Sequence, residues 1–138
     1  MTDRAGGRFV HHCALRWSDM DVFGHVNNAR FLTLYEEARV ALMFANARAQ
    51  GVTSFEEGVV IARHEVDYLR PVAYHQRCRI ELWVAEVRPS RFTVAYEFFA
   101  DDVIASRARS VCVPFDVAAG RPRRLSAAER AFLEPWLS

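Results

Sequence analysis

The stretch that decides the fold runs from Trp17 to Asn28 and reads WSDMDVFGHVNN. It sets two carboxylates, Asp19 and Asp21, directly before a long segment whose apolar stripe predicts a helix. Backbone N–H groups in a first helical turn lack partners within the helix and attract negative charge. They can polarise a carbonyl, which a nearby carboxylate then attacks directly or through water. The stretch therefore predicts an acyl-transfer site, and the alternative is a loop that only caps the helix, since Asp and Asn are common there.

One long helix is predicted over residues 28–50, directly after this stretch. Its apolar side chains recur at helical spacing, and Gly51 is a typical residue for the helix end. These apolar positions are Phe31, Leu34, Tyr35, Ala38, Ala41, Leu42 and Ala45. Before the stretch, residues 9–17 are predicted to form a strand that leads straight into the loop.

Four alternating runs follow the helix and predict strands. They are residues 59–68, 78–87, 92–100 and 103–115. In the first run the residues expected to share one face are Val60, Ala62, His64, Val66 and Tyr68. Near the C-terminus, Ser126 and Glu129 have the spacing of a capping box, which predicts a short helix from Ala127 toward Leu133.

The order of these elements predicts an α+β fold in which an antiparallel sheet wraps around one long central helix. The last four strands are expected to form an antiparallel meander, and residues 1–138 a single domain. Such a sheet leaves free edges and a second apolar face, which pairing with another copy would cover. We therefore expect a homodimer or a homotetramer.

Composition excludes several classes of function. All 18 basic residues are arginine, against 17 acids, and the net charge of +1 gives no general drive toward nucleic acid or anionic membranes. No stretch is long enough for a membrane span, and residues 1–7 have no apolar signal sequence, so a cytoplasmic location is expected. The cysteines, Cys13, Cys78 and Cys112, are far apart in sequence and are expected to be buried, reduced thiols. No Cys or His spacing indicates a metal.

Three segments carry a resemblance to a known family. They are WSDMDVFGHVNNARFLTLYEEAR (17–39), HEVDYLRPV (64–72) and RARSVCVPFDVAAGRP (107–122). The sequence resembles the hotdog-fold acyl-CoA thioesterases related to 4-hydroxybenzoyl-CoA thioesterase. The resemblance implies a hotdog domain that hydrolyses an acyl-CoA thioester to a free acid and coenzyme A without a metal or redox cofactor. It also implies an active site that lies between subunits.

The resemblance assigns the reacting groups. Asp21 matches the catalytic carboxylate of the family, which acts as a nucleophile or as a general base for water. The backbone N–H of Asn28 matches the group that polarises the thioester carbonyl. From the residues themselves, Trp17 and Phe23 are expected to surround Asp21 with apolar side chains and so raise its basicity. Asp19 is expected to be structural.

Further residues are expected to bind the substrate. Gly24 permits a positive backbone dihedral or a close approach of substrate. His25 and Asn27 order the loop or touch the acyl group, and Asn27 has the alternative role of helix cap. Tyr68 matches a strand end that contacts the acyl chain across the subunit interface, with core packing as the alternative. His64 is expected to be a core histidine.

The turn from Arg88 to Arg91 departs from the family, in which many members have small polar residues there. Arg88 and Arg91 are candidates for binding the phosphates of coenzyme A, because guanidinium groups pair well with phosphate. Two alternatives to an acyl-CoA thioesterase remain open. One is a thioesterase acting on acyl carrier protein, and the other is a non-catalytic hotdog protein that binds acyl-CoA. A second group of hotdog thioesterases carries its acid on the long helix, and the two-acid loop argues against that assignment.

Overall fold

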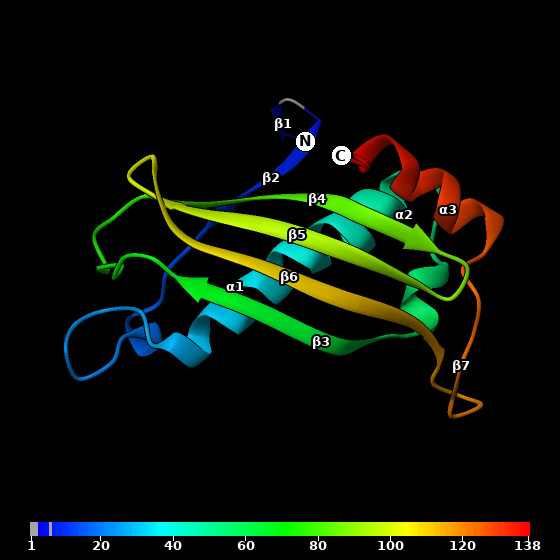
Figure 1. Cartoon of the computed structure of the whole chain (residues 1–138), viewed down its shortest axis with the longest axis horizontal. Helices are drawn as coiled ribbons and strands as arrows, with labels where there is room; N and C mark the ends of the chain where they lie inside the picture. Colours follow the sequence, from blue (N-terminus) through cyan, green and yellow to red (C-terminus); the bar gives the residue numbers. More distant parts are fainter. Residues whose placement is uncertain (1–2, 6) are drawn as a thin grey trace.

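The computed structural model describes residues 3–5 and 7–138. A seven-stranded antiparallel sheet curls around one long helix (Figure 1), with strand order β1-β2-β4-β5-β6-β3 and β7 paired to β6. The strands are β1 (Asp3–Ala5), β2 (Arg8–Cys13), β3 (Val59–Tyr68), β4 (Cys78–Arg88), β5 (Arg91–Ala100), β6 (Val103–Asp116) and β7 (Arg121–Pro122). The predicted α+β architecture is confirmed.

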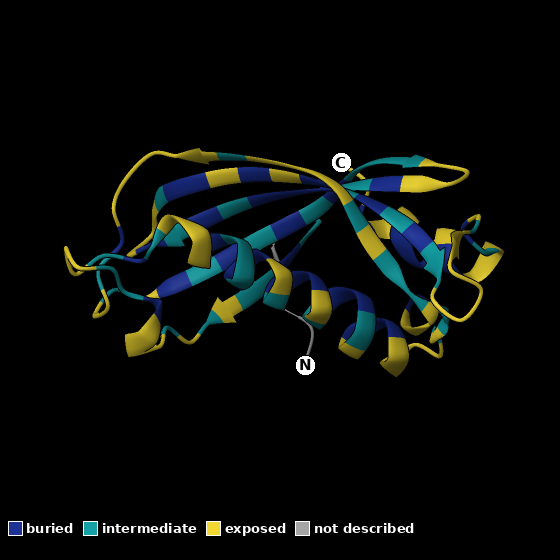
Figure 2. Ribbon diagram, turned by 90° about the horizontal axis from the view of Figure 1, so that it is seen from below, coloured by how far each residue is buried: buried dark blue, intermediate teal, exposed yellow. Residues whose placement is uncertain are grey.

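The central helix spans the predicted range. α1 (Asn28–Val40) continues through a π-helical segment, η2 (Ala41–Asn46), into α2 (Ala47–Ala49). The helix stops where Gly51 takes a φ of +81°, a conformation that favours glycine. Figure 2 shows that the side of this helix toward the sheet is buried and the other side is exposed. The buried side chains include Leu34, Tyr35, Ala38 and Leu42.

Two predictions at the N-terminal strand and in the strand order are wrong. β2 ends at Cys13 instead of residue 17, because the chain turns into a 3-10 helix, η1 (Trp17–Asp19), in which the Asp19 carboxylate accepts the Arg16 N–H at 2.8 Å. The meander holds only for β4, β5 and β6. β3 is the edge strand beside β6 instead of the neighbour of β4, and sequence alternation alone does not reveal this pairing. The short strands β1 and β7 were not predicted.

The predicted face of β3 is also wrong at its first residues. The register with β6 shifts between Ile61 and Arg63, so Ala62 lies in a β-bulge. Ile61 lies opposite buried Cys112, whereas Val60 points to the other face and is 41% exposed. The bulge therefore puts Val59 and Ile61, instead of Val60 and Ala62, on the face shared by His64, Val66 and Tyr68.

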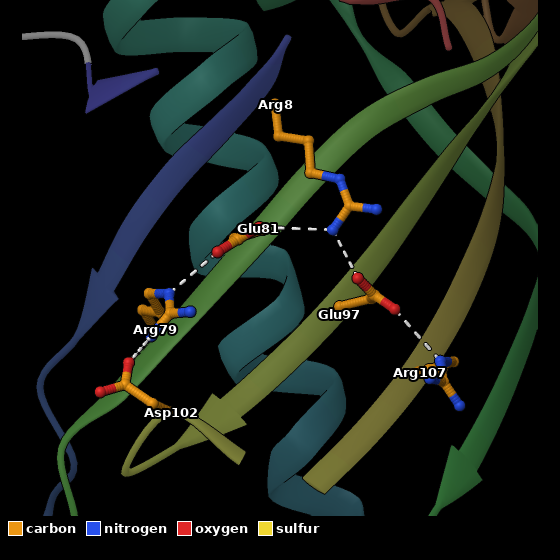
Figure 3. Close-up of polar contacts among 6 residues, drawn as sticks. All are labelled: Arg8, Arg79, Glu81, Glu97, Asp102 and Arg107. Atoms are coloured by element: carbon orange, nitrogen blue, oxygen red, sulfur yellow. Dashed lines mark hydrogen bonds and ion pairs between the residues drawn. The ribbon is translucent and has the colours of Figure 1, made fainter. Parts of the chain in front are cut away.

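The sheet face turned away from the helix is charged, so the expected second apolar face is wrong. Arg8 forms ion pairs with Glu81 and Glu97, and Glu97 also pairs with Arg107 at 3.1 Å (Figure 3). Arg79 bonds to Glu81 at 2.9 Å and to Asp102. Cross-strand charge pairs therefore cover much of this face, and Arg8 and Arg79 also stack on the rings of Trp83 and Phe99.

The outer edge of β3 and the C-terminal helix complete the description of the fold. Within the described residues β3 pairs only with β6, so its other edge presents unpaired backbone groups. The helix α3 (Ala127–Leu133) forms as predicted, with the reciprocal capping bonds between Ser126 and Glu129. Short 3-10 helices η3 (Ser54–Glu57) and η4 (Glu134–Trp136) flank these elements. No helix in the described part of the chain is long and apolar enough to cross a membrane.

Candidate active site

The loop before α1 is fastened by its own backbone and by the segment before β4. The Asp21 N–H donates to the His25 carbonyl at 2.7 Å, and the Gly24 N–H donates back to the Asp21 carbonyl at 3.1 Å. The Val26 N–H donates to the Val72 carbonyl at 2.8 Å. Gly24 has a φ of +79° and open space around its missing Cβ, so the turn requires a glycine for its backbone angle, not for room.

The Asp21 carboxylate is held at one oxygen. Its Oδ1 accepts the N–H of Phe23 at 2.9 Å and the N–H of His25 at 3.2 Å. No hydrogen bond within the described residues uses Oδ2. The loop thus orients the carboxylate while leaving its second oxygen available for chemistry.

Trp17 and Phe23 do not surround Asp21, so that prediction is wrong. Trp17 is 75% exposed and Phe23 is 79% exposed. The Trp17 ring packs edge-on against Tyr74, with 5.6 Å between the ring centroids. The local bonds of the turn, and not apolar contacts with these two rings, fix the Asp21 carboxylate.

The start of α1 lines the same pocket as Asp21. Asn27 is the N-cap, and its side-chain oxygen accepts the Ala29 N–H at 2.9 Å. The Asn28 N–H belongs to the first helical turn, and no hydrogen bond among the described residues uses it. Tyr68, at the end of β3, donates its hydroxyl to the Asn28 carbonyl at 2.7 Å, and burial raises the pKa of this hydroxyl.

These groups border one pocket of about 340 Å³. Its lining is Asp21, His25, Val26, Asn28, Phe31, Tyr68, Leu69, Arg70 and Pro71. The structure therefore brings together the predicted residues Asp21, His25, Asn28 and Tyr68 from two segments that are distant in sequence. Gly24 and Asn27 do not line the pocket. They lie in the loop before α1 and contribute to its conformation. The pocket also includes Arg70, which was not predicted as a site residue. Arg70 lies in the segment 64–72, two residues after Tyr68.

Arg88 and Arg91 are not part of this pocket within one chain. They face each other at the turn between β4 and β5, and Arg88 pairs with Glu86 at 3.1 Å. Tyr68 lies level with Phe98 through the register of β6, seven residues from Arg91 along β5. At the usual strand rise this separation is about 23 Å. In Figure 1 the turn lies at the opposite end of the sheet from the loop before α1.

The other two acid–base candidates have structural partners. Asp19 is fully buried, its carboxylate accepts the Arg16 N–H, and its carbonyl accepts the Asn27 N–H at 2.8 Å. The structural role predicted for Asp19 is therefore supported by its contacts. The prediction that His64 is a core residue is wrong, because the residue is exposed on the edge strand β3. Its Nδ1 is 2.7 Å from the Ser110 hydroxyl. Partial burial and the nearby Arg39 lower the pKa of His64.

The pocket offers the chemistry of its own side chains and backbone. An oriented carboxylate, a helix N-terminus and an adjacent guanidinium can bind and attack an activated carbonyl. Among residues 3–5 and 7–138, no group of three or more His, Cys, Asp or Glu side chains could hold a metal ion.

Known proteins share both the sequence pattern and the fold. A model of the thioesterase-like superfamily matches residues 15–136. The uncharacterized protein YsmA of Bacillus subtilis is 30% identical over 92 residues, which cover 64% of this chain and 58% of YsmA. The match thus spans less than two thirds of that relative.

Two solved structures extend the likeness over nearly the whole chain. A predicted thioesterase from Bacillus stearothermophilus is 26% identical with a TM-score of 0.82, and the match covers 95% of this chain and 97% of that one. A thioesterase from Thermus thermophilus, solved as a complex with coenzyme A and Zn, is 27% identical with a TM-score of 0.76, covering 93% and 92% of the two chains. The curled sheet, the central helix and the family match together show that this chain belongs to the thioesterase-like superfamily and has the hotdog fold.

Proposed function

We propose that the protein hydrolyses acyl-CoA thioesters to a free acid and coenzyme A. The observation that carries the proposal is the pocket that is lined both by Asp21 and by Asn28 at the helix start. A thioester needs those two groups, one to polarise its carbonyl oxygen and one to deliver or activate the nucleophile. Membership of the thioesterase-like superfamily supports the reaction type.

The residues have distinct roles in this mechanism. The thioester oxygen accepts the Asn28 N–H, which stabilises the negative charge that develops as the carbonyl is attacked. Asp21 then either takes a proton from water, whose oxygen adds to the carbonyl, or attacks the carbonyl itself. In the second route water hydrolyses the resulting anhydride and regenerates the carboxylate. In both routes the carbon–sulfur bond breaks and the thiolate takes up a proton.

The loop backbone prepares Asp21 for either route. The N–H groups of Phe23 and His25 bind Oδ1 and so fix the direction in which Oδ2 points. Tyr68 holds the first turn of α1 by its bond to the Asn28 carbonyl. His25, Gly24 and Asn27 act through the shape of the loop, and His25 also borders the acyl group.

Coenzyme A as the carrier is supported by the relative from Thermus thermophilus, which was solved with that molecule bound. Arg70 borders the pocket and is suited to pair with a phosphate of the nucleotide. A role for Arg88 and Arg91 requires a second copy of the chain, because within one chain they lie at the far end of the sheet.

A homodimer or homotetramer is part of the proposal. The free edge of β3 is ten residues long, and edge-to-edge pairing with a second copy would satisfy its backbone groups. Tyr68 lies at the end of that edge strand, so the pocket would sit next to the interface. The acyl chain could then contact both copies.

Two other functions use the same pocket. An acyl carrier protein as carrier, or acyl-CoA binding without turnover, would need the same carbonyl contacts. The deciding test is a hydrolysis screen with short, medium, long and aromatic acyl groups carried by coenzyme A and by acyl carrier protein, with release of free thiol as the readout. Turnover of the coenzyme A esters supports the proposal. Turnover of carrier-protein esters alone, or tight binding without thiol release, replaces it by the corresponding alternative.

A further inference from the structure

Cys13 and Cys78 lie directly opposite each other in neighbouring strands, although they are distant in sequence. Cys13 is the last residue of β2, Cys78 is the first residue of β4, and the antiparallel register pairs their Cα atoms. Residues opposed in this way have Cα atoms about 4.5–5.5 Å apart. A disulfide spans about 4.4–6.8 Å between Cα atoms, so the backbone of this pair already has the spacing of a bridge.

We propose that Cys13 and Cys78 form a dithiol site that exchanges with small disulfides to give an intramolecular bridge. The two cysteines are free thiols in the structure. Nothing in the proposed hydrolysis uses either of them, so the site is separate from the thioesterase pocket. The third cysteine, Cys112 on β6, is fully buried and has no opposing cysteine, because its register partners are Phe92 and Ile61.

The pair lies close to the surface, with both side chains on the face of the sheet that also carries buried Ile80 and Leu82. Cys78 is 6% exposed and lies in the wall of a pocket of about 370 Å³, whereas Cys13 is half-buried. The remaining wall is formed by His12, Arg77, Arg79, Asp101 and Asp102. Asp102 pairs with Arg79, and the Asp101 carboxylate accepts the backbone N–H of Arg77. The guanidinium groups suit a co-reactant that carries carboxylates, such as glutathione disulfide.

The exchange proceeds in two balanced steps. The Cys78 thiolate attacks one sulfur of the small disulfide, forms a mixed disulfide and releases the other half as a thiolate. The Cys13 thiolate then attacks the Cys78 sulfur and displaces the second half. Two protein S–H groups become one S–S bond, their two protons are released, and the small disulfide is reduced to two thiols that take up protons.

Both thiols resist ionisation, which sets the conditions for exchange. Burial raises the pKa of Cys13 to about 12, and the nearby Cys78 adds to the rise. Burial and then Asp101 raise the pKa of Cys78 to about 11. Because the thiolate is the attacking species, exchange is expected to be slow at neutral pH and to accelerate as the pH rises.

The test treats the folded protein with glutathione disulfide at neutral and at mildly alkaline pH. Free thiols counted after unfolding should fall from three to one, and the intact mass should drop by two hydrogen atoms. Cleavage after arginine separates the cysteines into peptides 9–16, 78–79 and 110–123, so mass spectrometry identifies the linked pair without any variant. The linked peptides should be 9–16 and 78–79, and bridging should be faster at the higher pH.

Three variants sharpen the assignment. Cys112→Ser is the matched control and should bridge like the wild type. Cys13→Ser should stop at a mixed disulfide on Cys78, with added mass of one glutathione unit, and Cys78→Ser should not bridge. A linked peptide that contains Cys112, a disulfide between two chains, or three intact thiols in the folded protein after treatment would each overturn the proposal. Loss of thioesterase activity plays no part in any of these readouts.

Discussion

The Tyr68 hydroxyl donates a 2.7 Å hydrogen bond to the Asn28 carbonyl, which ties the end of β3 to the first turn of α1. The Tyr68 ring also packs edge-on against Phe31, with 5.2 Å between the ring centroids. Strand and helix are therefore joined at the level where the thioester carbonyl is proposed to bind. The bond fixes the helix start from the side of the sheet.

Tyr68→Phe should remove this bond while keeping the ring contact. A neutral hydrogen bond contributes about 1 kcal/mol, so kcat should fall by up to about five-fold and the melting temperature by a few degrees. Tyr74→Phe is a matched control, because Tyr74 is exposed and its ring packs on Trp17, a contact that phenylalanine keeps. Steady-state kinetics on both variants measure the effect. Equal activity of the two variants would remove the positioning role from Tyr68.

The local parts of this site could be predicted from sequence, and the non-local parts could not. The loop from Trp17 to Asn28 and the helix after it follow from capping residues, a glycine and apolar spacing, all within a few residues of one another. The bulge at Ala62 leaves no mark on alternation, and it exchanged the faces of the first β3 residues. The distance of Arg88 from the pocket depends on which strands pair, which is a property of the whole sheet.

Asp21→Asn should separate chemistry from loop structure. The amide keeps the size and one acceptor for the N–H groups of Phe23 and His25, but it loses charge and basicity. Loss of a general base should lower kcat by about 10² to 10⁴, with a small change in stability. Asp19→Asn is the paired variant, and because Asp19 is buried and bonds to the Arg16 N–H, its main effect should be a lower melting temperature. Wild-type turnover by Asp21→Asn would refute the mechanism at its centre.

Substitutions of Arg70, Arg88 and Arg91 should show which of these arginines binds coenzyme A. Arg70→Ala should raise the KM for acyl-CoA more than the KM for a truncated thioester that lacks the nucleotide, because a phosphate contact contributes uniform binding. The double variant Arg88→Ala with Arg91→Ala should show the same split if a second copy brings that turn to the nucleotide. Equal changes for the two substrates would instead assign those arginines a structural role.

Glu129→Gln should destabilise the fold at neutral pH. Glu129 is 0% exposed, and its carboxylate binds the guanidinium of Arg123 at 2.8 and 2.9 Å. Burial by itself raises the pKa of Glu129, but the bonds from Arg123 and from the Ser126 N–H outweigh it, so the pKa is lowered overall. Removing the charge from such a buried pair should cost about 3 kcal/mol of unfolding free energy.

The pH dependence of that cost follows from the lowered pKa. The stabilisation is present above the pKa of an unfolded glutamate and is lost as the pH falls through the folded value. Urea unfolding should therefore show the largest gap between wild type and Glu129→Gln at neutral pH, and the gap should shrink on acidification. Glu134→Gln, an exposed glutamate just after α3, should show no comparable gap at any pH. A gap that is constant with pH would exclude the ion pair as its cause.

The outer edge of β3 predicts that the protein is at least a dimer in solution. Among residues 3–5 and 7–138 no strand pairs with the outer edge of the ten-residue strand β3, which favours pairing with a second copy, and the proposed pocket lies at the end of that strand. Light scattering on the purified protein should give at least twice the chain mass of 15.8 kDa. Activity per chain should fall on dilution if the partner completes the pocket, because dissociation then removes part of the site. A monomer that is fully active at low concentration would show that one chain holds the whole site, and that Arg88 and Arg91 have no part in it.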